Sequence, residues 1–582
     1  MSSVRGRIKA VLFDVGGVLV PQPQKAIARY ENELGLRKRF LSELFLEGES
    51  YSAFCRLERG LLTVSEFCKE FDVAVRSKAH LENAPLPVNF STLRLMQAFQ
   101  AHTTGKKADF ALLFQQSVNK QMLNAAKRLR KQNIRTCVLT NNWIDDIESS
   151  KGRNCRFMAT LGLFFDEVVQ SALIGMRKPS PEIYTYACRK LGVAPHETAF
   201  LDDLGVNLKS ASQLGIKCIK VDDTARSLKE LEKLCGVDLL FPAEDMVFPP
   251  PATPDKVCHS YAQVNEKMRL HFVDVGEGPV VLLLHGFPDC WYGWRYQIAA
   301  LAFAGYRVIA LDMPGYGESS APAAIDEYSH KKVSEDILSL LDMLCIPQAV
   351  VVGHDWGGSL AWYLALVYPH RFKGVCGVNT PFFPINPNKN PLESMYKRPG
   401  VFDYQLYFQE PGVAEKELEK NMKKTFSVIL QGVPKENEKR VWNALASTSN
   451  VRKRGGFLAG IPDDIPISSY LSEADIAYYI EQFKKNGFRG PLNWYRNYEA
   501  NWKWLSPFSE RKITIPALMV TASHDSVLKP EYSYGMEKAV TNLTRLHINR
   551  CSHWTPQEKP DELSRGIVNW LEMISAAPQA KL

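Results

Sequence analysis

The chain has 582 residues, of which 45% are hydrophobic and 23% charged, and its net charge of +8 is spread along the whole length. A single hydrophobic core stops growing at roughly 250–300 residues, so the length predicts two or more domains, and the ordinary composition excludes a largely disordered chain. The dispersed charge argues against nucleic-acid binding, and no apolar run reaches the roughly 20 residues of a membrane span. We therefore expect a folded, soluble protein with no nucleic-acid partner and no membrane span.

Cysteine usage and the last residues bear on localisation. The twelve cysteines are dispersed and form no C-x-x-C pair. This pattern is typical of free thiols in a reducing compartment, with neither a zinc site nor a disulfide framework, and it predicts a cytoplasmic protein. The terminal tripeptide, Ala580-Lys581-Leu582, differs by one small residue from the S-K-L peroxisomal signal, so a peroxisomal location is a second expectation.

Residues 1–240 alternate strand-like apolar runs with helix-like segments. The runs predicted as strands are Val11–Asp14, Arg135–Thr140, Ala199–Asp202 and Cys218–Val221. This alternation favours βαβ units and a doubly wound parallel sheet. Between the first two strands, residues at about 22–100 have a helical pattern and are expected to form a cap.

Four motifs follow the predicted strands of this domain. They are Phe13-Asp14-Val15-Gly16-Gly17, Leu139-Thr140-Asn141, Lys178-Pro179 and Leu201-Asp202-Asp203. In this order they resemble the motifs of the haloacid-dehalogenase-like phosphatases. The resemblance implies that Asp14 is the nucleophile that accepts phosphate, that Thr140 and Asn141 hold the phosphate and that Lys178 is a charge partner.

Position 16 is where the sequence departs from the family motif, and this departure bears on catalytic activity. The family implies a Mg²⁺ site made by Asp14, Asp203 and the main-chain carbonyl of Gly16. The family motif, D-x-D-G, has a second aspartate at this position, which protonates the leaving alcohol and then activates water. Glycine has no side chain for that task. The sequence therefore predicts a domain that binds phosphate and Mg²⁺ but turns over inefficiently, and a structural or dimer-forming role is the alternative.

A proline-rich segment, residues 241–256, separates this domain from the rest of the chain. Its run of three prolines and two more nearby cannot continue a helix or a central strand and favours an extended linker. From 257 to 582 the alternation resumes, so we predict a second doubly wound α/β domain. Its predicted strands are Val280–Leu284, Arg307–Leu311, Ala349–Gly353, Gly374–Val378, Ala517–Thr521 and Leu546–Ile548. The aromatic-rich interruption at about 380–508 is expected to form a helical lid.

The second domain contains a nucleophile elbow with aspartate where serine usually stands. Gly353-His354-Asp355-Trp356-Gly357 follows an apolar strand and precedes the helix-like residues Ser359–Tyr368. The G-x-S-x-G pattern requires this context of strand, turn and helix, and its glycines relieve a crowded turn. Asp355 is therefore the candidate nucleophile of an α/β-hydrolase.

The partners of the nucleophile follow in the order that α/β-hydrolases use, with the acid, Asp525, before the histidine, His553, each after a predicted strand. A carboxylate needs no base to attack a saturated carbon, so Asp355 would form an ester by opening a strained or activated C–X bond. The His553–Asp525 pair would then activate the water that hydrolyses the ester. The main-chain N–H groups of Phe287 and Trp356 are the expected oxyanion hole.

Further segments of the chain are similar to one family. HGFPDCW, GYGESS, GHDWGG, DYQLYFQEPG, GFRGPLNWYRN and the later HWT resemble the vertebrate soluble epoxide hydrolases, and the resemblance extends to the N-terminal domain and the linker. It implies that two lid tyrosines, Tyr404 and Tyr495, donate hydrogen bonds to the epoxide oxygen, whose alkoxide must be protonated as the ring opens. It also implies lipophilic epoxides such as fatty-acid epoxides as substrates, vicinal diols as products, no cofactor for this reaction and a homodimer.

The alternative for the second domain is a haloalkane-dehalogenase-like hydrolase, which also uses an aspartate elbow followed by tryptophan. A halide leaves without a proton, so that reaction has no use for the tyrosine pair. Tyr404 and Tyr495 therefore favour epoxide hydrolysis over dehalogenation.

Overall fold

The computed structural model describes residues 8–22, 24–46, 52–84, 86–88, 90–96, 118–146, 153–240, 248–433 and 448–576. These residues form two compact units, and the chain passes from the first to the second at Pro250 and Pro251, within the predicted linker. Linker residues 241–247 and the terminal tripeptide Ala580-Lys581-Leu582 lie outside the described part. Among the described residues, no helix is long and apolar enough to cross a membrane.

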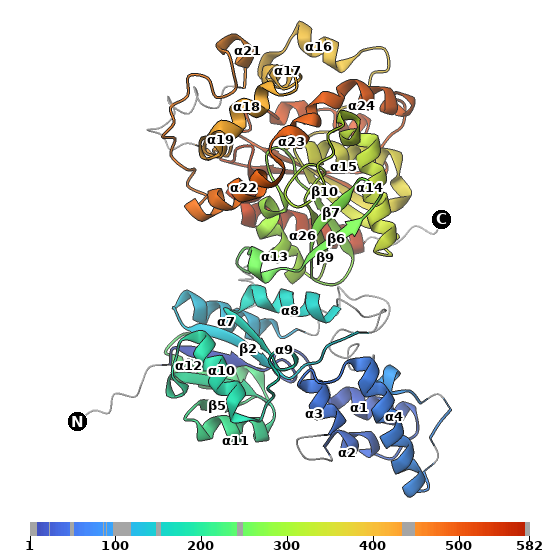
Figure 1. Ribbon diagram of the computed structural model, residues 1–582, viewed down its shortest axis with the longest axis vertical. Helices are drawn as coiled ribbons and strands as arrows, with labels where there is room; N and C mark the ends of the chain where they lie inside the picture. The colour runs from blue at the N-terminus through green and yellow to red at the C-terminus, as the bar shows by residue number, and fades with distance from the viewer. Residues whose placement is uncertain are drawn as a thin grey trace, which may run out of the picture. The chain divides into compact units, whose positions relative to one another are not determined.

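The first unit is built on a five-stranded parallel sheet in the order β3-β2-β1-β4-β5. The strands are β1 (Ala10–Phe13), β2 (Arg135–Thr140), β3 (Glu167–Gln170), β4 (Thr198–Asp202) and β5 (Lys217–Lys220). The helices that follow them are α7 (Lys120–Lys131), α8 (Arg153–Phe164), α9 (Ser171–Ile174), α10 (Pro181–Leu191), α11 (Gly205–Gln213) and α12 (Thr224–Cys235), labelled in Figure 1. The central strands are wholly buried, as parallel strands between helical layers are.

The insertion after β1 forms a helical cap with its own core, drawn in blue in Figure 1. Its helices are α1 (Gln24–Glu33), α2 (Phe40–Leu46), α3 (Ala53–Glu58) and α4 (Val64–Leu81). In α4 the buried residues Val64, Phe67, Phe71 and Val75 recur at helical spacing, so one face packs into the cap core. The helical cap is therefore present as the sequence predicts.

The second unit contains an eight-stranded sheet in the order β13-β12-β11-β10-β8-β9-β7-β6. The strands are β6 (His259–Gln263), β7 (Arg269–Val275), β8 (Val280–Leu284), β9 (Arg307–Leu311), β10 (Ala349–His354), β11 (Phe372–Val378), β12 (Ala517–Ala522) and β13 (Leu543–Ile548). Strands β8 to β13 are parallel to one another and lie where the sequence predicts strands. The hairpin of β6 and β7 was not predicted, and it adds an antiparallel edge to the sheet.

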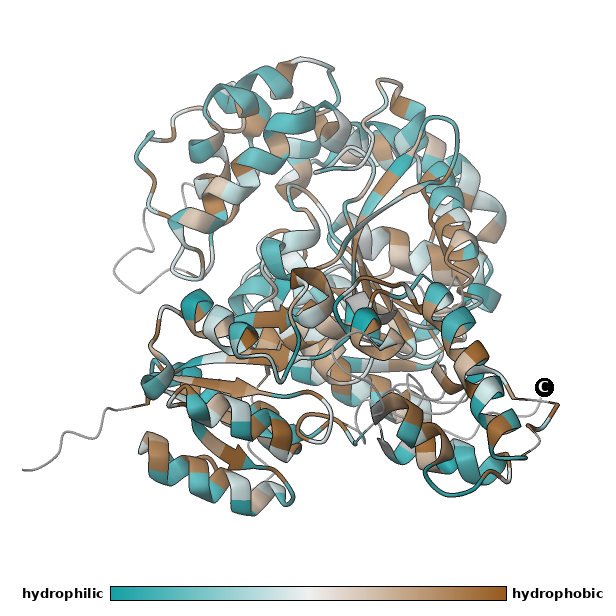
Figure 2. Cartoon of the chain, turned by 60° about the horizontal axis from the view of Figure 1, so that its bottom comes forward, coloured by the Kyte–Doolittle hydropathy of each residue, from teal (hydrophilic) through white to brown (hydrophobic). Residues whose placement is uncertain are grey.

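Helices pack against the strands of this unit, and in Figure 2 most helix ribbons carry both brown and teal residues. They include α13 (Arg295–Phe303), α14 (His330–Met343), α15 (Trp356–Val367), α25 (Thr555–Glu558) and α26 (Pro560–Ala576). In α14 the buried Val333, Ile337 and Leu340 mark the face that packs inward. Helix α15 begins at Trp356, three residues before the predicted start at Ser359, because the strand turns directly into the helix at the elbow.

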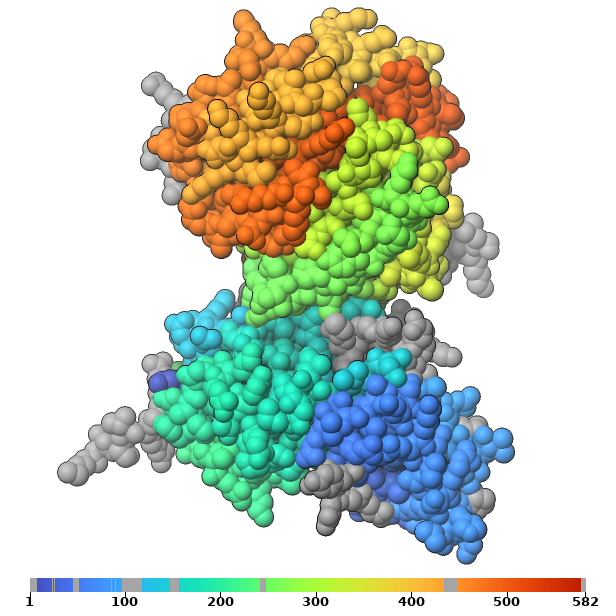
Figure 3. Space-filling model, viewed as in Figure 1, coloured from blue at the N-terminus to red at the C-terminus, as the bar shows by residue number. Residues whose placement is uncertain are grey.

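The lid lies between β11 and β12, as predicted, and is helical in its described part. Its helices are α16 (Pro391–Lys397), α17 (Asp403–Tyr407), α18 (Val413–Lys420), α19 (Met422–Ile429), α21 (Val451–Arg454), α22 (Glu473–Asn486), α23 (Arg489–Asn493) and α24 (Tyr498–Leu505). Lid residues 434–447 are outside the described part. In Figure 3 the yellow and orange residues of the lid form a continuous layer against the green residues of the same unit.

Candidate active sites

Asp355 stands at the sharp turn between β10 and α15. Its backbone has φ 52° and ψ −119°, a conformation that residues with a side chain rarely adopt. The surrounding structure holds this turn, since Thr380 Oγ1 donates to the main-chain carbonyl of Asp355 at 2.9 Å. Strained backbone of this kind is typical of a nucleophile elbow and places the carboxylate at the carboxyl end of the sheet.

Close contacts with a main-chain carbonyl and with the Asp355 side chain explain two glycines near the elbow. A Cβ added at Gly357 would lie 2.2 Å from the carbonyl oxygen of Leu284, and one added at Gly286 would lie 2.3 Å from Asp355 Oδ1. Real Cβ atoms do not approach so closely, so both positions need glycine. Gly357 belongs to the elbow motif, whereas Gly286 lies in the loop after β8 that carries the second oxyanion donor.

Two main-chain donors point at the Asp355 carboxylate. The N–H of Phe287 donates to Asp355 Oδ1 at 2.9 Å, and the N–H of Trp356 also donates to this carboxylate. Burial raises the pKa of Asp355, and the attraction of His553 and the two N–H donors offset part of that rise. The structure thus brings both predicted oxyanion residues to the nucleophile.

His553 lies between the two carboxylates. Its Nδ1 is 2.9 Å from Asp525 Oδ2, and its Nε2 is 3.7 Å from Asp355 Oδ2. Burial would lower the pKa of His553, but the charge and hydrogen bond of Asp525, together with the charge of Asp355, raise it to about 9. Burial would likewise raise the pKa of Asp525, but His553 and neighbouring donors lower it to about 2. The pair is therefore an imidazolium and a carboxylate in the resting enzyme.

Two side chains that the sequence analysis did not single out hold this pair. Asn379 Nδ2 donates to Asp525 Oδ2 at 2.8 Å, and His354 Nε2 contacts the main-chain carbonyl of His553 at 2.8 Å. Burial lowers the pKa of His354 to about 3, so the ring is neutral and Nε2–H is the donor. Both residues stand where a parallel strand ends, which is the signal that could have indicated them.

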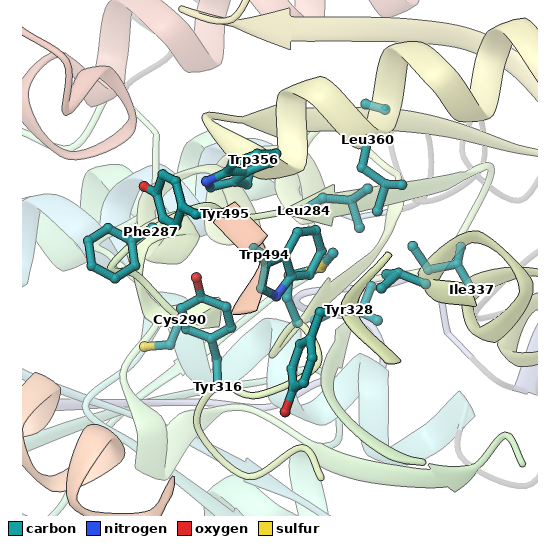
Figure 4. Close-up of a cluster of buried hydrophobic side chains, with 14 of the residues drawn as sticks. Leu284, Phe287, Cys290, Tyr316, Tyr328, Ile337, Trp356, Leu360, Trp494 and Tyr495 are labelled. Carbon is teal, nitrogen blue, oxygen red and sulfur yellow. The ribbon is translucent and has the colours of Figure 1, made fainter. Parts of the chain in front are cut away.

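The two lid tyrosines enter the same site. Tyr404 lies in α17, and Tyr495 follows α23 after one residue, Trp494. The ring of Tyr495 is 5.0 Å from that of Trp356, 5.4 Å from that of Phe287 and 5.9 Å from that of Tyr404, between ring centroids. Figure 4 shows Tyr495 between Phe287 and Trp356. Burial, with the nearby charge of Asp355, raises the pKa of both tyrosines above the ordinary value, so both hydroxyls are protonated donors near neutral pH.

The first unit carries a second candidate site at the carboxyl end of its sheet. Oxygen atoms of Asp14, Asp202 and Asp203 lie within 4.8 Å of one another. Lys178 Nζ is 2.6 Å from Asp14 Oδ1 and 2.8 Å from Asp202 Oδ2. Burial raises the pKa of Asp14 to about 8, and Lys178 opposes that rise. Three carboxylates form a hard oxygen donor set that fits Mg²⁺, and Asp202 joins the two ligands that the motifs indicate.

Asn141, Thr140 and Gly16, the other residues predicted for this site, each have a different local role. The side chain of Asn141 binds the main chain of Lys178, donating to its carbonyl at 3.0 Å and accepting from its N–H at 2.9 Å. Asn141 therefore positions the lysine loop, a role that the sequence did not indicate. Thr140 ends β2, and its Oγ1 donates to the Asn141 carbonyl at 3.3 Å. Gly16 forms an isolated β-bridge with Val20 and keeps a φ outside the left-handed region.

The fold and the sites define the class as an α/β-hydrolase with an aspartate at the nucleophile elbow, joined to a haloacid-dehalogenase-like unit. Family comparison agrees, since residues 279–560 match the alpha/beta hydrolase fold and residues 8–215 match the haloacid dehalogenase-like hydrolases. Bifunctional epoxide hydrolase 2 of Sus scrofa is 44% identical over 98% of this chain and 99% of its own, and that of Mus musculus is 42% identical over 97% and 98%. The chain belongs to the family of bifunctional epoxide hydrolases.

A solved structure adds a comparison for the second unit. The epoxide hydrolase from an endophytic Streptomyces is 32% identical, covers 55% of this chain and 96% of its own, and has a TM-score of 0.50.

Proposed function

We propose that the second unit hydrolyses epoxides to vicinal diols through an ester on Asp355. The observation that carries the proposal is that a partly buried carboxylate at a nucleophile elbow shares its site with two protonated tyrosines, Tyr404 and Tyr495. A halide would leave without a proton, whereas an epoxide oxygen needs one. The relatives whose names state epoxide hydrolase support the same reaction.

In the first step, Asp355 attacks a ring carbon. Its Oδ1 already accepts the Phe287 N–H, so Oδ2 is the oxygen that forms the new bond. The C–O bond of the ring breaks, and the developing alkoxide takes a proton from Tyr404 or Tyr495. Since both donors are fixed in a buried site, they stabilise the developing charge without a large reorganisation.

Before the second step, His553 gives its resting proton to the tyrosinate left by ring opening. Water then attacks the carbonyl carbon of the ester while His553 Nε2 takes a proton from that water. The oxyanion forms on Oδ1, which accepts the Phe287 N–H, and the Trp356 N–H donates to the same carboxylate. The tetrahedral intermediate breaks its bond to the alkyl oxygen, which takes the proton back from His553 and leaves as the diol. Esterification removes the charge of Asp355, which is one of the causes that raise the pKa of His553. His553 therefore loses its proton more readily in the ester than in the resting enzyme, at the stage when a base is needed.

The walls of the site favour lipophilic substrates. Rings of Phe287, Phe408 and Tyr495 lie 5.1–5.5 Å apart between centroids, so an apolar epoxide such as a fatty-acid epoxide would replace little water and lose few hydrogen bonds. Both steps use groups of the chain and water.

We also propose a homodimer, which sedimentation velocity of the full chain would test.

Oxygen labelling tests the proposed reaction. We expect the full chain, in excess over a lipophilic epoxide in H₂¹⁸O, to give diol whose new oxygen is unlabelled in the first turnover, because that oxygen comes from Asp355. The label should appear in the peptide that contains Asp355. Diol labelled at once would show direct attack by water, and absence of diol would contradict the proposed function itself.

For the first unit, we propose a Mg²⁺-binding phosphatase-like site of low activity. Asp14, Asp202 and Asp203 would hold the ion, which would supply charge neutralisation to a bound phosphate, and Asp14 would act as the nucleophile. Lys178 balances the charge of the carboxylates. No side chain at Gly16 is present to protonate an alcohol, and a positioned general acid is worth about 10²–10⁴-fold. Poor leaving groups should therefore be hydrolysed slowly.

A further inference from the structure

A third tyrosine is connected to Tyr404 through one amide side chain. Tyr498 is the first residue of α24, and its hydroxyl donates to Gln405 Oε1. Gln405 Nε2 in turn donates to the hydroxyl oxygen of Tyr404 at 2.9 Å. The three polar groups thus form a directed chain in which Tyr498 donates to Gln405 and Gln405 donates to Tyr404.

The direction of this chain decides where the Tyr404 proton goes. As long as Gln405 presents its NH₂ to Tyr404, the Tyr404 oxygen accepts a hydrogen bond and its own proton is available to the epoxide. If the amide turned over, Gln405 Oε1 would face Tyr404 and accept that same proton. The two arrangements have nearly the same shape, but only the first leaves Tyr404 as a donor to substrate.

The rest of α17 is fixed, so the amide is the part that can turn. Asp403 accepts hydrogen bonds from Arg452 Nε at 2.7 Å and from the Arg452 N–H at 2.9 Å, and the carbonyl of Gln405 accepts from Gln409 Nε2 at 2.9 Å. Gln405 is 8% exposed, so water is a poor substitute partner for its amide. A hydrogen-bonding partner on the protein must select the orientation.

Tyr498 is that partner. Burial raises the pKa of Tyr498 well above its ordinary value, so its hydroxyl keeps its proton. Among the residues that the structure describes, Gln405 Oε1 is the acceptor found for this proton. Turning the amide would leave the Tyr498 proton without an acceptor, and an unsatisfied group of this kind shifts an equilibrium by about 5- to 150-fold.

We propose that Tyr498 is a positioning residue for ring opening, because it holds the Gln405 amide in the orientation that keeps the Tyr404 proton available to the epoxide. This inference rests on the proposed epoxide hydrolysis. Tyr498 itself is not the proton donor, and its effect passes through Gln405.

The test measures ring opening alone, as the rate of ester formation on Asp355 in the full chain carrying His553→Gln. In this background we expect Tyr498→Phe to slow ester formation by about tenfold or more, because Oε1 then finds its donor in Tyr404. Adding Gln405→Met should restore most of the rate, since methionine has a similar shape and no carbonyl to take the proton. A purely structural role for Tyr498 predicts the opposite, with the double variant as slow as the single variant or slower.

The controls separate the possible failures. Tyr363→Phe removes another buried tyrosine hydroxyl, which contacts the Phe383 carbonyl at 3.3 Å, and should leave the rate unchanged. If Tyr498→Phe does not fold, the single variant Gln405→Met provides the test. We expect its rate of ester formation to stay close to that of the parent. An unchanged rate in folded Tyr498→Phe, or no restoration by Gln405→Met, overturns the inference. No ester in the parent would instead contradict the proposed function.

Discussion

Replacing Tyr404 and Tyr495 with phenylalanine tests whether ring opening depends on donated protons. Tyr404 is 7% exposed and Tyr495 is 1% exposed, so water does not readily replace either hydroxyl. One donor aimed at a developing oxyanion is worth about 10²–10³-fold in rate. We expect each single variant to slow ester formation by about 10²-fold, because the other tyrosine remains, and the double variant to lose nearly all ring opening.

The two single variants should differ in stability. Tyr404→Phe leaves Gln405 Nε2, which donates to the Tyr404 oxygen at 2.9 Å, without its acceptor. A buried donor left unsatisfied costs about 1–3 kcal/mol, so the Tm of Tyr404→Phe should fall. Thermal unfolding therefore accompanies the rate measurement and separates lost donation from lost folding.

The assay is single-turnover formation of the ester, followed by the mass of the protein in the His553→Gln background. A matched control is Tyr363→Phe, which removes a tyrosine hydroxyl from the same hydrophobic core. A folded double variant that keeps most of its ring-opening rate would contradict proton donation by the two tyrosines and would favour the dehalogenase-like alternative.

Three further predictions concern charge and metal binding. The pKa of His553 is raised to about 9, so the stability that its ion pair with Asp525 contributes is complete below about pH 6.5 and is lost as the pH rises through 9. The Tm difference between wild type and Asp525→Asn should therefore shrink from pH 6 to pH 10. A constant difference would contradict an ion pair between His553 and Asp525. Gly16→Asp should raise Mg²⁺-dependent hydrolysis of alkyl phosphates by about 10²–10⁴-fold, whereas brisk wild-type turnover that Asp14→Asn abolishes would show that another group supplies the proton. Gly17→Ala would place a Cβ 2.4 Å from Asp203 Oδ2 at a φ of +77°, so calorimetry should show weaker Mg²⁺ binding, and undiminished binding would argue against this site.

The parallel strands and the elbow could be predicted because their signals are local. Buried parallel strands are continuous apolar runs, as in Val280–Leu284, and the elbow has a fixed glycine spacing around Asp355. The hairpin β6–β7 was missed because His259–Gln263 is a mostly exposed edge strand with polar residues. Strand β3 was missed because it has four residues and polar ends.

The supporting residues of the site could not be predicted, because their contacts join distant parts of the chain. Asn379 and Asp525 are 146 residues apart, and Tyr498 and Gln405 are 93 apart. Polar residues at strand ends are common, so residue type alone does not indicate that Asp202 is a further carboxylate of the metal site. Only the fold shows which of them meet.

The most direct test of the central claim, that Asp355 is the nucleophile, is the mass of the full-length His553→Gln protein after reaction with a lipophilic epoxide. We expect a mass gain of one epoxide, located on the peptide that contains Asp355, and no gain when Asp355→Asn is added. Asp355→Asn alone should form no diol. A His553→Gln protein that does not react with epoxide, or that carries the adduct on another residue, would contradict this division of roles.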